Sequence, residues 1–112
     1  MSVDFVQDGR SFDYTPGSAV TAGDVIVLGD LVCVAKLDIP AGVQGALTVS
    51  GVFDFPKATG GGTAIAAGVN VYWDAADTEA KEDSESGANK LIGKTIAAAA
   101  DGDATVRVRM TQ

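Results

Sequence analysis

The sequence has no histidine, the residue that most often serves as a general base or a metal ligand. It has a single cysteine, Cys33, which excludes an intrachain disulfide and a cysteine-rich zinc site. No apolar run approaches the roughly 18 residues of a membrane span, and the first residues lack the regions of a signal peptide. We therefore expect a soluble protein, made in a reducing cytoplasm, that is not an enzyme and holds no cofactor or metal.

Aromatic residues are also scarce, at 6% of the chain, and basic residues are outnumbered by acidic ones, 8 to 15. The net charge of −7 excludes functions that depend on neutralising phosphate. We expect neither nucleic acid nor an anionic membrane as a partner. The 112 residues are 46% hydrophobic, mainly through small side chains, which predicts one domain with a thin core.

Apolar residues recur with period two, which predicts an all-β protein. Residues 24–28 and 31–37 flank Gly29-Asp30, the signature of a hairpin with a type II′ turn. Residues 44–55 predict one strand with a bulge at Gly51, ended by Pro56. Further strands are expected at residues 70–74, 78–81, 90–96 and 104–110. This pattern favours a small β-barrel or a jelly-roll-like sandwich.

Residues 1–16 differ from the β domain expected over residues 17–112, because they carry aromatics in an extended pattern. Phe5, Phe12 and Tyr14 lie in this segment, which we interpret as an extended N-terminal arm. Such an arm either pairs with another subunit or forms an ordinary strand of its own sheet, and the sequence leaves both open.

A small residue and a glycine recur in the turns before expected strands: residues 22–24, 40–42, 67–69 and 99–102. The spacing between these turns is irregular, which indicates one turn type used several times and not a solenoid repeat. The alanine-rich residues 96–100 are the one helical candidate, and they are too few to hold a helix alone.

Residues 87–95 come nearest to a phosphate-binding loop. Five residues separate Gly87 from Gly93, whereas a P-loop has about four between its glycines. An acidic segment, residues 82–89, leads into this stretch where a P-loop would follow a hydrophobic strand. We interpret these residues as a turn followed by a strand.

Two groups of carboxylates are candidates for a calcium site, namely Asp74, Asp77 and Glu79, and the pair Asp101 and Asp103. Neither group has the spacing of a calcium-binding loop, and aspartate is a preferred turn residue. The simpler interpretation is that both groups stabilise turns.

The remaining prominent side chains have apolar roles. Cys33 lies between two valines and is expected to be a small buried hydrophobe. Trp73 is the largest apolar side chain, and is either a core residue or an interface anchor. Phe53 and Phe55 lie on one face of their strand, which favours the core.

Six segments, in this order and spacing, carry a family resemblance. They are Phe5-Val6-Gln7-Asp8-Gly9-Arg10, Asp13-Tyr14-Thr15-Pro16, residues 22–32 (from Ala22-Gly23-Asp24), Gly51-Val52-Phe53-Asp54-Phe55-Pro56-Lys57, Val71-Tyr72-Trp73-Asp74 and residues 99–108 (from Ala99-Ala100-Asp101). As a set they resemble a family of small proteins of tailed bacteriophages and prophages. Its members are labelled either as a domain of unknown function, as RecA/RadA-like phage recombinases, or as capsid cement (decoration) proteins.

The recombinase label conflicts with the residues, because such an enzyme needs an intact P-loop, a DNA-binding surface and an α/β domain. The cement label fits a small acidic β protein. The resemblance therefore implies a homo-oligomer, dimer or trimer, that binds the major capsid protein on the outer surface of the virion and stabilises the shell. A nucleotide-binding recombination accessory protein and a fibre or baseplate module are the alternatives.

The residues that we expect to contact the capsid or another subunit are Phe5, Phe12, Tyr14, Phe53, Phe55 and Pro56. They combine the aromatics of the arm with the end of one strand. Aromatic anchors are the side chains that dominate most protein interfaces.

We expect that the purified protein binds neither ATP nor DNA, because its glycine spacing is wrong for a phosphate loop and its net charge is −7. Thermal unfolding should not shift when ATP and Mg²⁺ are added. Saturable ATP binding, or a DNA complex that survives about 150 mM salt, would contradict this expectation.

Overall fold

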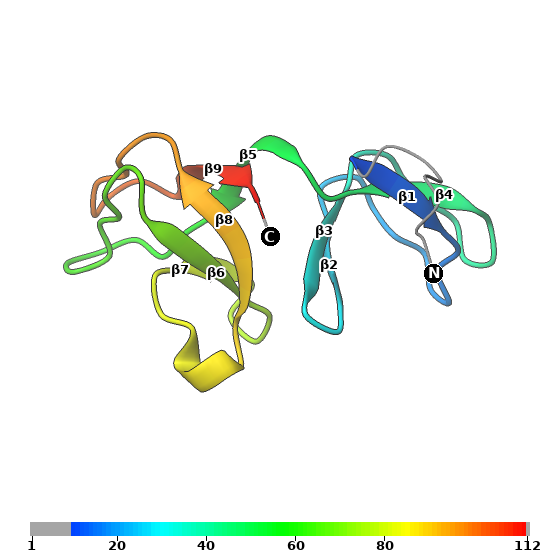
Figure 1. Ribbon diagram of the computed structural model, residues 1–112, viewed down its shortest axis with the longest axis horizontal. Coiled ribbons are helices and arrows are strands. Elements are labelled where there is room, and N and C mark those ends of the chain that lie inside the picture. Colours follow the sequence, from blue (N-terminus) through cyan, green and yellow to red (C-terminus); the bar gives the residue numbers. More distant parts are fainter. Residues whose placement is uncertain (1–9, 112) are drawn as a thin grey trace, which may run out of the picture.

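The computed structural model describes residues 10–111, which form two antiparallel β-sheets arranged as two lobes (Figure 1). The first sheet has the order β1-β4-β3-β2, with β1 (Ser11–Tyr14), β2 (Val25–Leu28), β3 (Leu31–Ala35) and β4 (Gly45–Thr48). The second has the order β5-β9-β8-β6-β7, with β5 (Gly51–Pro56), β6 (Asn70–Asp74), β7 (Glu79–Lys81), β8 (Lys90–Thr95) and β9 (Thr105–Met110). A 3-10 helix, η1, spans Glu85–Gly87. The prediction of an all-β protein is confirmed; the sheets form a sandwich-like arrangement and not a closed barrel.

The two sheets repeat the same four-strand unit. Strands β1, β2, β3 and β4 occupy the same places in their sheet as β5, β6, β8 and β9 in theirs. The isolated bridge between Val20 and Ile39 has its counterpart between Ile65 and Ala99. The recurring turns noted in the sequence fall at equivalent positions of the two units, so they are reused turns that also mark a structural repeat.

The hydrogen bonds that frame each unit agree closely. Gly23 N donates to Ala35 O at 2.7 Å in the first unit, and Gly68 N donates to Thr95 O at 2.8 Å in the second. The units differ between their second and third strands. The first has the two-residue turn Gly29-Asp30, where Gly29 has φ 61°, as a type II′ turn requires. The second has residues 75–89, which include β7 and η1.

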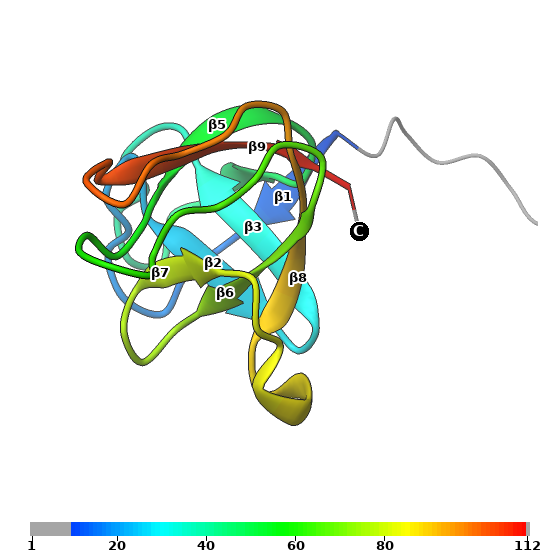
Figure 2. The ribbon, with the colours of Figure 1, turned by 90° about the vertical axis from the view of Figure 1, so that its left-hand side faces the viewer.

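The main core lies between the two sheets. Val32 and Val34 of β3 belong to the same buried cluster as Phe55, Trp73 and Val108 of the second sheet. The rings of Phe55 and Trp73 meet edge to face, with centroids 6.1 Å apart. Seen from the second lobe, the β2–β3 hairpin lies behind β6 and β8 (Figure 2). Trp73 is 6% exposed, so of the two interpretations of this residue the core role is confirmed.

A second, smaller core lies on the other face of the first sheet. It contains Cys33, Ala35, Ile39 and Leu47, with Phe12 and Tyr14 among the half-buried residues that cover it. Cys33 is fully buried, as predicted, and burial raises the pKa of its thiol to about 11. Strand β3 therefore contributes alternate side chains to two different cores.

The expectation of one strand over residues 44–55 is wrong. The chain forms β4 in the first sheet, leaves it at Val49 and Ser50, and enters the second sheet as β5. Gly51, predicted as a bulge, is the first residue of β5 and has φ 121°, a backbone conformation that favours glycine. The sequence shows the break in alternation but not that the strand changes sheets there.

Residues 11–14, part of the expected arm, form β1 and pair with β4 of the same chain, so here the chain supplies a strand of its own sheet. The rest of that segment, with Phe5, lies outside the described residues. The alanine-rich residues 96–100 form no helix. Along β9, Val106, Val108 and Met110 are buried and the intervening residues are exposed, as the alternation predicts.

Close packing of two strands gives a sharp test of the second sheet. A Cβ added to Gly93 in β8 would lie 2.0 Å from the backbone oxygen of Arg109 in β9. We expect Gly93→Ala to lower the free energy of unfolding by about 3 kcal/mol or more, because the backbone must move apart. Gly102→Ala, where an added Cβ meets nothing within 4 Å, is the control and should change stability by less than about 0.5 kcal/mol in denaturant unfolding.

Candidate functional site

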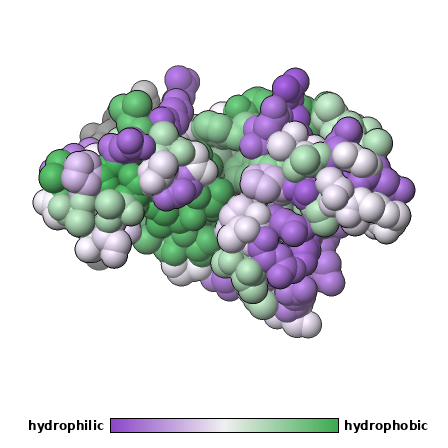
Figure 3. All heavy atoms as spheres, turned by 180° about the vertical axis from the view of Figure 1, so that it is seen from behind, coloured by the Kyte–Doolittle hydropathy of each residue, from purple (hydrophilic) through white to green (hydrophobic). Residues whose placement is uncertain are grey.

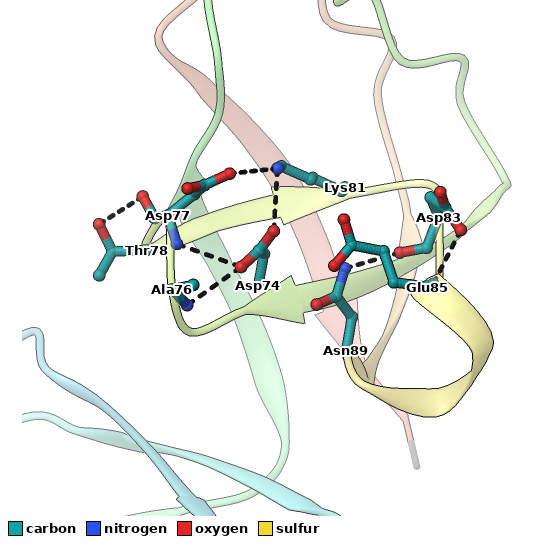
Figure 4. Close-up of polar contacts among 8 residues, drawn as sticks. All are labelled: Asp74, Ala76, Asp77, Thr78, Lys81, Asp83, Glu85 and Asn89. Carbon is teal, nitrogen blue, oxygen red and sulfur yellow. Dashed lines mark hydrogen bonds and ion pairs between the residues drawn. The ribbon is translucent and has the colours of Figure 1, made fainter.

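The turn between β6 and β7 gathers the carboxylates that the sequence offered as a calcium site (Figure 4). Asp74 Oδ1 accepts hydrogen bonds from the backbone N–H groups of Ala76 and Asp77 at 3.0 and 3.1 Å. Its Oδ2 accepts from Lys81 Nζ at 2.9 Å, and the same ammonium lies 2.6 Å from Asp77 Oδ2. Both carboxylate oxygens of Asp74 are therefore engaged by groups of the turn and of β7. This confirms the interpretation of Asp74 as a turn residue.

Electrostatics in this turn follow from those contacts. Hydrogen bonds from Lys81 and from the backbone hold the pKa of Asp74 below its ordinary value, and the two carboxylates raise the pKa of Lys81. Asp101 Oδ1 accepts from the backbone N–H groups of Thr63 and Ala64 in the loop that follows β5, and Asp103 Oδ2 accepts from Ala100 N in its own turn. Within residues 10–111, no three or more histidine, cysteine or acidic side chains cluster as metal ligands.

The acidic segment, residues 82–89, is folded into a compact loop (Figure 4). Asp83 Oδ1 accepts from Glu85 N at 2.8 Å, and Asn89 Nδ2 donates to Asp83 O at 2.9 Å. Lys90 Nζ lies 2.9 Å from Asp30 Oδ1 at the tip of the β2–β3 hairpin, so it links the two lobes. Residues 87–95 are thus the predicted turn and strand, and Lys90, one of their two lysines, is engaged in an ion pair.

The structure places the predicted contact residues in two separate lobes. Phe12 and Tyr14 are half-buried on β1, against the smaller core. Phe53 is half-buried and Pro56 exposed on β5, in the other lobe. Phe55 is 2% exposed within the main core, so its side chain is not on the surface. Phe5 lies outside the described residues.

Sequence reasoning missed most of the exposed apolar surface. The large apolar side chains that remain exposed are Leu28, Leu31, Leu37, Val43, Val52 and Ile96. Leu37 is the most exposed, at 76%, and follows β3 where the alternation ends. Figure 3 shows apolar atoms gathered over the middle of one face, where the β2–β3 hairpin stands in the opposite view. These side chains could have been recognised in the sequence as apolar residues that lie beside predicted turns.

The all-β body exposes apolar side chains on both lobes, which is a feature of interaction surfaces. Residues 6–110 match the phage cement protein family. The chain belongs to that family. No curated protein and no solved structure matches it. The resemblance to capsid cement proteins is therefore confirmed, and the phage cement protein is a structural component associated with the capsid. Within residues 10–111, no helix has the length and apolar character needed to span a bilayer.

The turn around Asp74 predicts a pH dependence of the stability of this cement protein. Because the pKa of Asp74 is lower in the folded than in the unfolded protein, its ionised form stabilises the fold above a pH of about 4, and this contribution is lost as the pH falls through the folded pKa. We expect Asp74→Asn to be less stable than the parent at pH 7, and the difference to shrink below pH 4.

Urea unfolding at several pH values measures this effect. Asp13→Asn is the matched control, because Asp13 is exposed on β1. If the difference in unfolding free energy between Asp74→Asn and the parent stays constant from pH 7 to about pH 3, the carboxylate charge does not stabilise the turn.

Proposed function

We propose that this cement protein binds the outer surface of the major capsid protein lattice and holds neighbouring capsid subunits together. The match to the phage cement protein family over residues 6–110 carries this proposal. The structure supports it with a body of 46 × 36 × 24 Å whose two lobes each expose apolar side chains. One copy can therefore rest on two lattice subunits across their boundary.

The contacts follow from which apolar side chains each lobe leaves uncovered. In the first lobe, Leu37 and Val43 are exposed on either side of the turn before β4. They lie near the end of β1, where the half-buried Tyr14 pairs with Gly45 of β4. In the second, Val52 on β5 is 51% exposed and neighbours Phe53. Each lobe buries only a modest area, so one contact is weak. Engagement of both lobes, repeated over many copies on one shell, gives avidity.

The mechanism is mechanical and needs no chemistry at the site. Internal pressure from packed DNA separates capsid subunits, and a clamp across their boundary adds its binding free energy to the closed arrangement. The acidic surface discourages the protein from binding the packaged nucleic acid, because like charges repel. The protein is a homo-oligomer on the virion and is made in the cytoplasm of the host.

The direct experiment is binding to expanded capsids that lack this protein. We expect the purified chain to co-sediment with them and to raise their resistance to heat. Leu37→Asp and Val52→Asp should each weaken binding by about fivefold or more, because both side chains are exposed and each change places a charge in the contact.

Thr59→Asp is the control, since it adds the same charge at an exposed polar position. Equal binding by all four proteins would show that the clamp lies elsewhere on the surface. No binding to capsids, together with labelling of fibres or the baseplate in electron micrographs, would move the protein to a different part of the virion.

A further inference from the structure

Strand β2 is an edge strand with backbone groups directed outward. Leu28 and Leu31 face each other across the two-residue turn, and Ile26 faces Cys33. These are the hydrogen-bonded pairs of an antiparallel hairpin, so Val25 and Val27 lie in the alternate pairs and point their N–H and C=O groups away from β3. Within residues 10–111, nothing pairs with this edge of β2.

A cleft runs along the same edge. Its volume is about 510 Å³, and it is lined by residues 23–27 together with Pro56, Trp73, Ala75 and Thr78. Residues 25–27 of β2 all line the cleft although alternate side chains of a strand point to opposite faces, so the strand presents its edge to the cleft. The cleft therefore offers backbone hydrogen bonds on one side and apolar contact with Trp73 and Pro56 on the other.

In the second unit, a further strand covers the edge that is open beside β2 in the first unit. Strand β6 is the counterpart of β2, and its outer edge is covered by β7, with Trp73 opposite Ala80 and Asp74 opposite Glu79. Ala80 is 2% exposed, so the added strand seals the core there. The same four-strand arrangement is thus completed by a fifth strand in one unit and left open in the other.

We infer that β2 accepts a fifth strand from the N-terminal segment, residues 2–8, of a second copy of this chain. Ser2-Val3-Asp4-Phe5-Val6 alternates apolar and polar side chains over its first four residues. In an extended strand Val3 and Phe5 share one face, which suits a cleft lined by Trp73 and Pro56. The main-chain hydrogen bonds supply affinity and the alternate side chains supply register.

The geometry of the first sheet points to a second copy and not to the same chain. Ser11, Thr48, Val34 and Val25 lie in register across the sheet. The start of β1 is therefore four strand spacings, roughly 19 Å, from a strand added beyond β2. With residues 3–6 paired, the five steps from residue 6 to residue 11 span at most about 18 Å when fully extended, which falls short of this distance.

The donor segment and the acceptor edge lie on opposite sides of the sheet, since β1 and β2 are its two edge strands. Copies joined in this way make head-to-tail contacts, which close into a ring or continue as a chain. This oligomer does not depend on the capsid, so it forms in the purified protein whether or not the protein binds capsids.

Hydrogen exchange on the intact protein tests the edge without any substitution. The amides of Val25 and Val27 should exchange at least about tenfold more slowly in the oligomer than in a chain lacking residues 2–9. Fast exchange of both amides in the intact oligomer would overturn the inference. Protection that appears only on capsids would also overturn it, because the occupant would then be a capsid segment.

Truncation and a peptide test the donor. The deletion removes residues 2–9 only, because Ser11–Tyr14 is part of the sheet. We expect the truncated chain to remain folded and to sediment as a monomer. A synthetic peptide of residues 1–9 should bind it and shift the fluorescence of Trp73, the only tryptophan, which lines the cleft.

Proline variants test the acceptor edge. Val27→Pro removes an outward N–H, a change that edge strands tolerate, and should abolish peptide binding. Asp54→Pro is the control, because Lys57 N bonds to Ala104 O and the alternation along β5 directs the Asp54 N–H outward at another edge. A truncated chain that stays oligomeric, or equal peptide binding by both variants, would overturn the inference. If the truncated chain unfolds, hydrogen exchange on the intact protein decides.

Discussion

Burial of strand β3 on both of its faces is the constraint on which the rest of this structure depends. Val32 and Val34 enter the core between the two sheets, whereas Cys33 and Ala35 enter the core of the first lobe, and all four are at most 6% exposed. A charged or large side chain at any of these positions would disturb one core without touching the other. In a thin, aromatic-poor domain this sharing lets one strand hold two cores together.

The repeat of a four-strand unit explains how so small a chain builds a body with two lobes. Each unit alone has a sheet with one poorly covered face, and the units bury those faces against each other through β3 and the second sheet. The repeat is imperfect at one place. Residues 75–89 replace a two-residue turn and include the strand β7. Lys90, which follows them at the start of β8, forms the ion pair with Asp30 that connects the lobes.

The binding role of a cement protein is consistent with a chain whose carboxylates stabilise its own turns and loops. Asp74, Asp77, Asp101 and Asp103 accept hydrogen bonds from backbone N–H groups or from Lys81. What remains for a partner is shape, exposed apolar side chains on each lobe and an uncovered strand edge. These are features of recognition, since none of them requires a group to gain or lose a proton.

The sequence alone determined the features that depend on neighbours along the chain. Apolar runs on either side of Gly29-Asp30 located the β2–β3 hairpin. Period-two alternation located the strand from Thr105 to Met110, because a half-buried strand must alternate. Glycine and aspartate marked the turns, because few other residues tolerate their backbone conformations. Only the tertiary structure decided that the chain changes sheets at Ser50, that Leu37 and Val52 stay exposed, and that two units repeat. Those outcomes rest on contacts between residues far apart in sequence, and local alternation carries no information about which sheet a strand joins or which edge stays open.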